Sequence, residues 1–165
     1  AAIAVQAALT GHMLLSTIHT NDSVGIIARL TDMSVEPFLI GSTLLGGLAQ
    51  RLARRICSNC KEEIKASDEL KKLFEAEGIA PPSHTFQGAG CKKCHMTGAR
   101  GRVGLYELLE VTPPIRDLIN RKALEEEVRR TLMSSGFQTL YFDGLNKVAE
   151  GMLTIEEVQR VCKTI

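Results

Sequence analysis

The sequence predicts an α/β fold, in which part of a sheet with its helices is followed by a small metal-bound subdomain and a C-terminal helical lobe. Three features support this prediction. A short apolar run lies between two helical patterns near the start of the chain, four of the five cysteines form two Cys-x-x-Cys pairs, and the last third has helical periodicity. A chain of 165 residues can bury one core with small satellites.

Helix, strand and helix follow one another in the first part of the chain. Residues 1–10 (AAIAVQAALT) predict a helix that ends at Gly11, because glycine tolerates a left-handed C-terminal turn. Residues 12–18 (HMLLSTI) are mostly apolar and have the length of a buried parallel strand. Asn21 or Asp22 is then placed to cap a following helix.

His19 directly follows the expected strand. Ligands bind at the carboxyl ends of strands in α/β sheets, so His19 is a candidate functional residue. The alternative is a contact in a turn or at a helix start, with no functional part. For His12, at the beginning of the same run, a structural role is as well supported as a functional one.

The stretch 44–56 (LLGGLAQRLARRI) follows a helix that Pro37 is expected to begin. Large apolar residues recur in it every four positions, which favours a helix. The Gly-Gly pair at 46–47 instead favours a break, followed by a strand with three apolar residues on one face: Leu48, Leu52 and Ile56. Periodicity alone does not decide between these two patterns.

The strongest chemical signal is the two pairs Cys57/Cys60 and Cys91/Cys94. Each pair places two thiolates at one tight turn, and two such turns facing each other make a tetrahedral site of four sulfurs. Zn²⁺ fits such a site, because it is soft enough for sulfur and has no geometric demand of its own. Two disulfides or a redox dithiol are the alternatives, but a redox dithiol usually stands alone beside a βαβ pattern. We therefore predict structural zinc.

Four basic side chains lie near the second pair. His84 and His95 are possible metal ligands, but His95 directly follows Cys94 and points away from a shared turn, and four thiolates already fill the shell. Lys92 and Lys93 lie inside the pair, where their charge would soften the net negative charge of a four-thiolate site.

The segment between the cysteine pairs is expected to form a small subdomain. Ser67 or Asp68 is placed to cap an amphipathic helix that runs to about Glu77, and Gly78 ends it. Residues 80–83 (APPS) make a stiff connector. So small a unit buries too little apolar surface to fold alone, and a bound metal would supply the missing stability.

The remaining residues predict one strand and then helices. Residues 102–111 (RVGLYELLEV) read as a strand that returns to the main sheet, and residues 112–114 (TPP) begin a helix. Three further helical patterns follow, of which two end at Gly136 and Gly151. The last opens with a capping box from Thr154 to Glu157. It also contains Cys162, which is most simply a small core residue.

Composition excludes several classes of function. The net charge is +1, only 4% of residues are aromatic and tryptophan is absent, so a nucleic-acid-binding surface is poorly supported. No apolar run approaches the ~20 residues that span a bilayer, so we expect neither direct membrane insertion nor a signal peptide. Cysteine usage fits a reducing cytoplasm. The chain begins without Met inside an expected helix, as a fragment would.

Four segments, in order along nearly the whole chain, resemble the secretion ATPases that drive type II secretion and type IV pilus assembly. They are residues 10–12 (TGH) with 16–21 (STIHTN), 49–60 (AQRLARRICSNC), 101–107 (GRVGLYE) and 151–158 (GMLTIEEV). The first is similar to the histidine box of that family, and the second to its approach to a tetracysteine subdomain.

The resemblance implies a RecA-like P-loop ATPase that works as a homo-hexamer with ATP and Mg²⁺. The chain would begin just after the Walker B segment, and no G-x-x-x-x-G-K-[ST] loop occurs in it. That loop cradles the phosphates, so the chain alone is expected neither to bind ATP tightly nor to hydrolyse it. The expected parts are residues 1–56 as the C-terminal part of the ATPase core, 57–97 as the zinc subdomain, and 98–165 as a return strand with a helical lobe.

The resemblance also assigns roles to individual residues. Residues 48–56 become a strand of the ATPase sheet, and His19 lies near the γ-phosphate, where it reports nucleotide state or orients water and phosphate. Arg51 and Arg102 become candidate nucleotide contacts, because an arginine in a hexameric motor can reach a neighbour's nucleotide. For the basic run that contains Arg51, Arg54 and Arg55, a solvated face or neutralisation of nearby acids is the more common explanation.

Type II protein secretion through pseudopilus assembly is the function that the resemblance implies, and type IV pilus assembly in the same family is the alternative. Such a protein is cytoplasmic, lies peripherally at the inner membrane of a bacterium, and acts on inner-membrane platform proteins. A zinc-ribbon nucleic-acid-binding module is a distant alternative. A catalytic zinc enzyme is not supported, because neither H-E-x-x-H nor H-x-E with P-C-x-x-C occurs.

Overall fold

The structure is a computed structural model, and it describes residues 1–162. The chain forms two compact units. Unit 1 contains Ala1–Ala49 and Glu107–Gln138, and unit 2 contains Gln50–Tyr106 and Thr139–Ile165. The segment 57–97 therefore shares a unit with the C-terminal helices, and the three-part division expected from the sequence stays a prediction.

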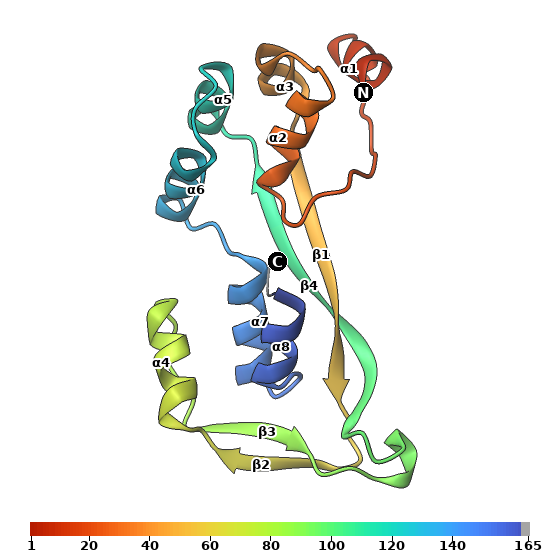
Figure 1. Cartoon of the computed structure of the whole chain (residues 1–165), viewed down its shortest axis with the longest axis vertical. Helices are drawn as coiled ribbons and strands as arrows, with labels where there is room; N and C mark the ends of the chain where they lie inside the picture. The colour runs from red at the N-terminus through yellow and green to blue at the C-terminus, as the bar shows by residue number, and fades with distance from the viewer. Residues whose placement is uncertain (163–165) are drawn as a thin grey trace. The chain divides into compact units, whose positions relative to one another are not determined.

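Unit 1 is built from five helices and one end of a two-stranded sheet (Figure 1). The helices are α1 (Ala2–Leu9), α2 (Gly25–Asp32), α3 (Pro37–Thr43), α5 (Pro113–Asn120) and α6 (Glu125–Ser134). Helix α3 packs against α1, α2 and α5, and α5 packs against α6. Their shared core is aliphatic, with Ile40, Leu109 and Ile115 each at most 1% exposed. The helix starts expected at Pro37 and at residues 112–114 are confirmed.

The two-stranded sheet consists of β1 (Gly46–Ile56) and β4 (Ala99–Glu110), and both strands pass from one unit into the other. The strand expected for residues 48–56 is confirmed, and so is the strand expected for residues 102–111. Val111 continues the contact beyond the strands by donating its backbone N–H to the Leu45 carbonyl at 3.0 Å.

The expected apolar face of β1 is wrong. Leu48 and Leu52 are 60% and 52% exposed, whereas Ile56 is 5% exposed. The buried positions near the start of the strand belong to small residues instead. A Cβ atom on Gly47 would lie 2.3 Å from Ile26 Cδ1, so α2 packs directly against the strand backbone there. Because α2 approaches so closely, the side of β1 that carries Gly47 faces the helix, and Leu48 and Leu52 lie on the opposite side.

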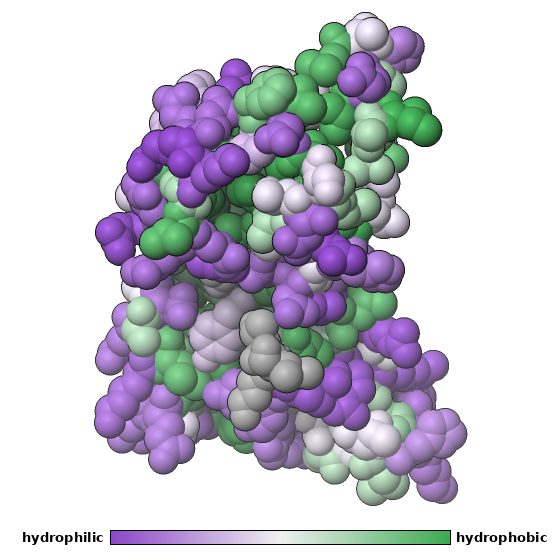
Figure 2. All heavy atoms as spheres, turned by 45° about the horizontal axis from the view of Figure 1, so that its top comes forward, coloured by the Kyte–Doolittle hydropathy of each residue, from purple (hydrophilic) through white to green (hydrophobic). Residues whose placement is uncertain are grey.

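The strand expected for residues 12–18 is also wrong. No residue from 12 to 20 belongs to a helix or strand, and Leu15 is 94% exposed. Figure 2 shows apolar side chains at the surface over this N-terminal part of unit 1. A strand needs a neighbour to satisfy its backbone N–H and C=O groups, and no strand of residues 1–162 pairs with this segment.

Unit 2 contains a second two-stranded sheet with helices. Strands β2 (Lys61–Lys65) and β3 (His84–Gly88) pair antiparallel, from Lys61 opposite Gly88 to Lys65 opposite His84. The helices are α4 (Asp68–Ala76), the 3₁₀ turn η1 (Lys92–Cys94), α7 (Leu140–Ala149) and α8 (Ile155–Cys162). The sequence did not predict β2, because its residues KEEIK are all exposed and carry no apolar alternation.

Helix α4 forms as its sequence predicts. The Ser67 hydroxyl oxygen accepts the Leu70 backbone N–H at 3.1 Å and so caps the helix. Phe74 is fully buried and Leu70 is 5% exposed, so these two residues form the buried side of the expected amphipathic helix. Gly78 follows the helix with a positive φ of 70°, as expected for a residue that ends a helix.

Gly151 ends α7, and the packing around it makes glycine obligatory. Its φ is +68°, and a Cβ atom would lie 2.3 Å from the Phe86 ring and 2.5 Å from Lys61 Nζ. The chain then enters α8, where the Thr154 hydroxyl accepts the Glu157 backbone N–H at 3.4 Å. The expected capping box is only half formed, because the Glu157 carboxylate binds arginine side chains instead. Cys162 lies at the end of α8 and is partly buried.

Candidate metal centre and histidine segment

The four sulfurs of Cys57, Cys60, Cys91 and Cys94 form one cluster in unit 2. All four lie within 4.8 Å of one another. The nearest pairs are 3.7 Å apart within the second Cys-x-x-Cys, and 3.9 Å apart between the two pairs. All five cysteines of the chain are free, so the two-disulfide alternative does not fit this geometry. The cluster is positioned to hold one metal ion.

Backbone hydrogen bonds shape the two turns that present the sulfurs. The Cys60 N–H donates to the Cys57 carbonyl at 3.2 Å, and the Cys94 N–H donates to the Cys91 carbonyl at 3.2 Å, so both turns close in the same way. A third bond ties the first turn to the chain just after the second turn, because the Cys57 N–H donates to the Gly98 carbonyl at 2.9 Å. The β2–β3 pairing brings the two turns, which are far apart in sequence, to one place.

The environment favours thiolates at the second turn. Desolvation raises the pKa of Cys94, but hydrogen bonds from the backbone N–H groups of Cys91 and Gly98 outweigh it and lower the pKa to about 6. Desolvation and the neighbouring thiols raise the pKa of Cys60 to about 12. Four adjacent sulfurs cannot all carry charge without a cation, so a cation that binds here would displace the remaining protons.

The histidines and lysines near the cluster do not belong to it. The group of four ligands includes neither His84 nor His95. His84 lies on β3 with Nδ1 3.6 Å from a Glu63 carboxylate oxygen. His95 follows η1 with a left-handed φ of 53°, and its side chain is exposed. Lys92 and Lys93 are exposed on η1, and their electrostatic effect on the site stays a prediction.

The histidine segment, residues 12–23, lies in unit 1. His12 and His19 are both exposed, and the His12 Nδ1 lies 3.0 Å from the Thr10 hydroxyl oxygen. Because the expected strand is absent, the strand-end argument for His19 no longer applies. A functional role for His19 now depends on the resemblance alone and stays a prediction.

Two contacts hold the end of the histidine segment, one buried and one partly buried, and the sequence did not predict the distant partner in either. The Glu107 carboxylate accepts the Ser23 backbone N–H at 2.8 Å and the Ser23 hydroxyl at 2.7 Å. Asp22 Oδ1 accepts the Gly25 N–H at 2.8 Å, which confirms the expected cap of α2, and Arg129 Nη2 donates to Asp22 Oδ2 at 2.6 Å. The motif at 101–107 ends in Glu107 and was the one available signal for the first contact.

The arginines of β1 differ in their surroundings. Arg54 is held by Glu157, which agrees with the interpretation that this run neutralises a nearby acid. Arg51 is partly buried, and Arg55 and Arg102 are exposed. A nucleotide contact by Arg51 or Arg102 stays a prediction.

Glu157 is a second buried carboxylate, after Glu107, whose contacts the sequence did not predict. It is 5% exposed and accepts hydrogen bonds from the Arg54 backbone N–H at 2.7 Å and from the Arg160 Nη2 at 2.5 Å. The bond from Arg160, together with those from the Arg54 side chain and backbone, outweighs desolvation and lowers the pKa of Glu157 to about 2.

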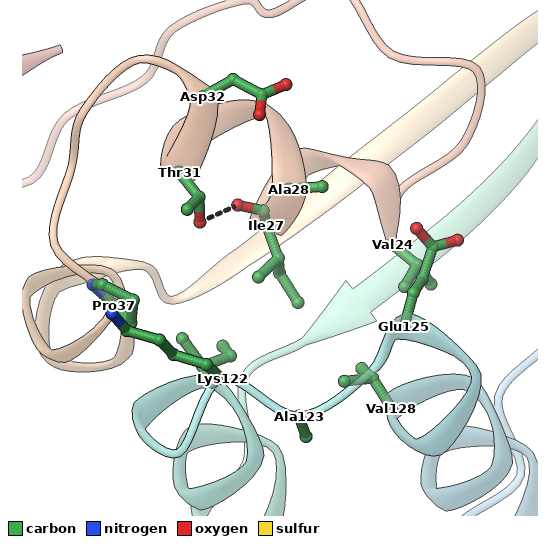
Figure 3. Close-up of a pocket in the computed structure, with 11 residues that line it drawn as sticks. Val24, Ile27, Ala28, Thr31, Asp32, Pro37, Lys122, Ala123, Glu125 and Val128 are labelled. Carbon is green, nitrogen blue, oxygen red and sulfur yellow. Dashed lines mark hydrogen bonds between the residues drawn. The ribbon is translucent and has the colours of Figure 1, made fainter.

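A pocket of about 300 Å³ lies in unit 1 between α2 and the turn that joins α5 to α6 (Figure 3). Its lining is mixed, with the apolar Val24, Ile27 and Val128 and the charged Asp32, Lys122 and Glu125. None of the residues that the sequence singled out for metal or nucleotide binding lines it.

Comparison with known proteins assigns this architecture to a family. The family model described as "Type II/IV secretion system protein" matches residues 1–160. The chain is 46% identical over 99% of its length to the type II secretion system ATPase E of Vibrio cholerae, and 47% identical over 99% to a type II secretion system protein E of Pseudomonas aeruginosa. It is 43% identical over 96% to the type IV pilus assembly ATPase PilB of Thermus thermophilus.

The fold has a counterpart among solved structures. A crystal structure of the pilus retraction motor PilT with bound ADP superposes with a TM-score of 0.63 over 99% of this chain and 36% of that chain, at 22% identity. The α/β fold expected from the resemblance is thus confirmed. The chain spans 32% of each of the two type II relatives and 18% of the PilB relative. The chain belongs to the type II/IV secretion system protein family.

Proposed function

We propose that this chain is part of an ATPase that powers type II protein secretion by driving assembly of a pseudopilus. The observation that carries the proposal is its identity of 46–47% over 99% of its length to three relatives named as type II secretion system proteins E or ATPase E. The working protein is a homo-hexamer that uses ATP and Mg²⁺. It lies in the bacterial cytoplasm at the inner membrane, where it passes motion to platform proteins.

Type IV pilus assembly is the second candidate function, because two pilus assembly ATPases are 43% and 40% identical to the chain over 96% of its length. Deleting the gene separates the two functions. Loss of type II secretion leaves exported enzymes in the periplasm while surface pili remain. Loss of surface pili with normal enzyme export identifies the pilus function and contradicts the first proposal.

Zn²⁺ is the proposed occupant of the cysteine cluster. A zinc–thiolate bond is about 2.3 Å long, so a regular tetrahedron around zinc places its sulfurs about 3.8 Å apart. The three nearest sulfur pairs, at 3.7 to 3.9 Å, match this spacing. Four protein ligands close the shell and leave no position for water or substrate, so the role of the ion is structural.

In the working ATPase, His19 lies near the γ-phosphate and reports nucleotide state, while Arg51 and Arg102 are candidate contacts to nucleotide. The resemblance of residues 10–12 and 16–21 to a histidine box supports this role, as does the exposure of His19, which leaves its ring accessible. Substituting His19 by Ala in the full-length protein tests it. The proposal expects a loss of at least about tenfold in kcat for ATP hydrolysis. An unchanged kcat would contradict it.

A further inference from the structure

Ser23, four residues after His19, is anchored to strand β4. The Glu107 Oε1 atom accepts both the backbone N–H and the hydroxyl of Ser23, at 2.8 and 2.7 Å. Ser23 is 0% exposed and Glu107 is 4% exposed. Hydrogen bonds to an ionised acceptor are stronger than neutral ones, and exclusion of water strengthens them further. This anchor therefore fixes the backbone of Ser23, because one of its two bonds is made by the main chain.

Asp22, the preceding residue, is anchored to a different element. Arg129 of α6 donates to Asp22 Oδ2 at 2.6 Å, while Asp22 Oδ1 caps the first turn of α2 through the Gly25 N–H. Arg129 is in turn held by Glu125 at 2.7 Å. Two consecutive residues of the histidine segment are thus tied to β4 and α6, which are distant in sequence.

The part of the segment that precedes these anchors is mostly exposed, His19 included, and belongs to no helix or strand. An extended chain spans at most about 3.6 Å per residue, so at most about 14 Å of chain separates His19 from the Ser23 anchor. The anchors at residues 22 and 23 therefore fix the chain within four residues of His19. A shift of about 1 Å in a group that acts on a reacting phosphate is enough to cost a large factor in rate.

We propose that Glu107 is a positioning residue for His19, assisted by Arg129: it holds the turn that presents the histidine to the nucleotide and does not itself touch the nucleotide. This proposal rests on the proposed role of His19 in sensing phosphate. Ser23 is the link through which Glu107 acts.

A double-mutant cycle in the full-length protein tests the proposal. ATP hydrolysis is measured for wild type, His19→Ala, Glu107→Gln and the double variant. Glu107→Gln keeps the shape of the side chain but removes its charge. We expect it to lower kcat about tenfold with a smaller change in KM, because geometry near the phosphate is affected more than ATP binding. In the His19→Ala background, we expect Glu107→Gln to cause no further loss.

The outcomes separate the two proposals. Equal losses from Glu107→Gln in the wild-type and His19→Ala backgrounds mean that Glu107 acts independently of His19, and the positioning role is then wrong. A large loss from His19→Ala with none from Glu107→Gln overturns the positioning role but keeps the proposed function. If His19→Ala has no effect, the proposed role of His19 fails, and the positioning role of Glu107 fails with it.

Amide hydrogen exchange of the 165-residue chain gives a second readout that does not depend on activity. Glu107→Gln is expected to speed exchange at Ser23 and at residues 19–22 about tenfold, because the Ser23 N–H loses a charged acceptor. Ser23→Ala, which removes only the hydroxyl donor, is expected to give a smaller change in the same direction. Thr139→Ala, which removes the cap of α7 in unit 2, controls for a general loss of stability. Unchanged exchange at Ser23 in Glu107→Gln would overturn the anchor.

Discussion

Glu157 and Arg54 are joined by two kinds of hydrogen bond at once. The Glu157 Oε1 atom accepts the Arg54 backbone N–H at 2.7 Å, and its Oε2 atom accepts the Arg54 Nη2 at 2.9 Å. The carboxylate of α8 thus holds the main chain of β1 as well as a side chain. The two residues are 103 positions apart, and together they attach the C-terminal helix of unit 2 to its strand.

Glu157→Gln is therefore expected to destabilise unit 2. Loss of the charge weakens bonds to two arginines and to one backbone N–H, while Arg54 and Arg160 stay largely exposed. The expected decrease in the free energy of unfolding is about 1–3 kcal/mol at pH 7, measured by thermal or denaturant unfolding. Glu156→Gln, on an exposed neighbouring position, is the matched control and is expected to change stability little.

The same contact predicts a pH dependence. The pKa of Glu157 in the folded chain is lowered to about 2 from an ordinary value of 4.5, so the carboxylate stabilises the folded state above pH 4.5. This contribution is lost progressively as the pH falls from about 4.5 towards 2. The difference in stability between wild type and Glu157→Gln should accordingly shrink over that range. A difference that stays constant down to pH 2 would contradict the assigned cause.

Metal content tests the cysteine cluster. The chain is expected to bind about one zinc ion, and Cys94→Ser is expected to remove it, because a hydroxyl is a poor ligand in a four-thiolate site. Cys162→Ser is the matched control, since Cys162 lies outside the cluster, and it should retain the metal. Elemental analysis of the purified chains gives the answer. A folded, reduced wild-type chain without metal would count against the proposed zinc site.

Gly151→Ala is expected to destabilise the chain more than Gly136→Ala. Both glycines have positive φ values, of +68° and +85°, so both substitutions carry a backbone cost of about 1 kcal/mol. At Gly136 a Cβ atom meets nothing within 4 Å, whereas at Gly151 it would lie 2.3 Å from the Phe86 ring. Packing should add about 1–3 kcal/mol at Gly151. Equal unfolding midpoints for the two variants would show that Phe86 moves aside without cost.

The chain on its own is expected not to hydrolyse ATP. It contains no G-x-x-x-x-G-K-[ST] loop, whose backbone N–H groups and lysine hold the phosphates. Phosphate release from the purified 165-residue chain should equal the background without protein. His19→Ala is the decisive control. If the wild-type chain hydrolyses ATP and this variant does not, the residues of this chain suffice for hydrolysis and the expectation is wrong.

Features that depend on neighbouring residues could be predicted well. Ser67 caps α4 and Pro37 begins α3, as expected, because a cap or a proline acts within one helical turn. The gathering of the four cysteines also followed from the sequence, since two Cys-x-x-Cys turns have few arrangements that suit sulfur other than a shared metal. The choice of strand for residues 46–56 needed the family resemblance, because its periodicity fitted a helix equally well.

Features that depend on distant partners could not be predicted. Residues 12–18 have the composition of a strand, but a strand forms only where another strand offers hydrogen bonds, and composition does not contain that information. Leu48 and Leu52 face outwards because Gly47 lets α2 approach the other side of β1.

By itself, the sequence predicted the grouping of the four cysteines, most helix starts and ends, and the family. Only the tertiary structure decided which carboxylates matter: Glu107 meets Ser23 across 84 residues, and Glu157 meets Arg54 across 103. The physical reason is range. Capping, turn formation and the pairing of two sulfurs within one Cys-x-x-Cys turn act over a few residues, whereas a buried charge binds whichever donors the fold brings to it.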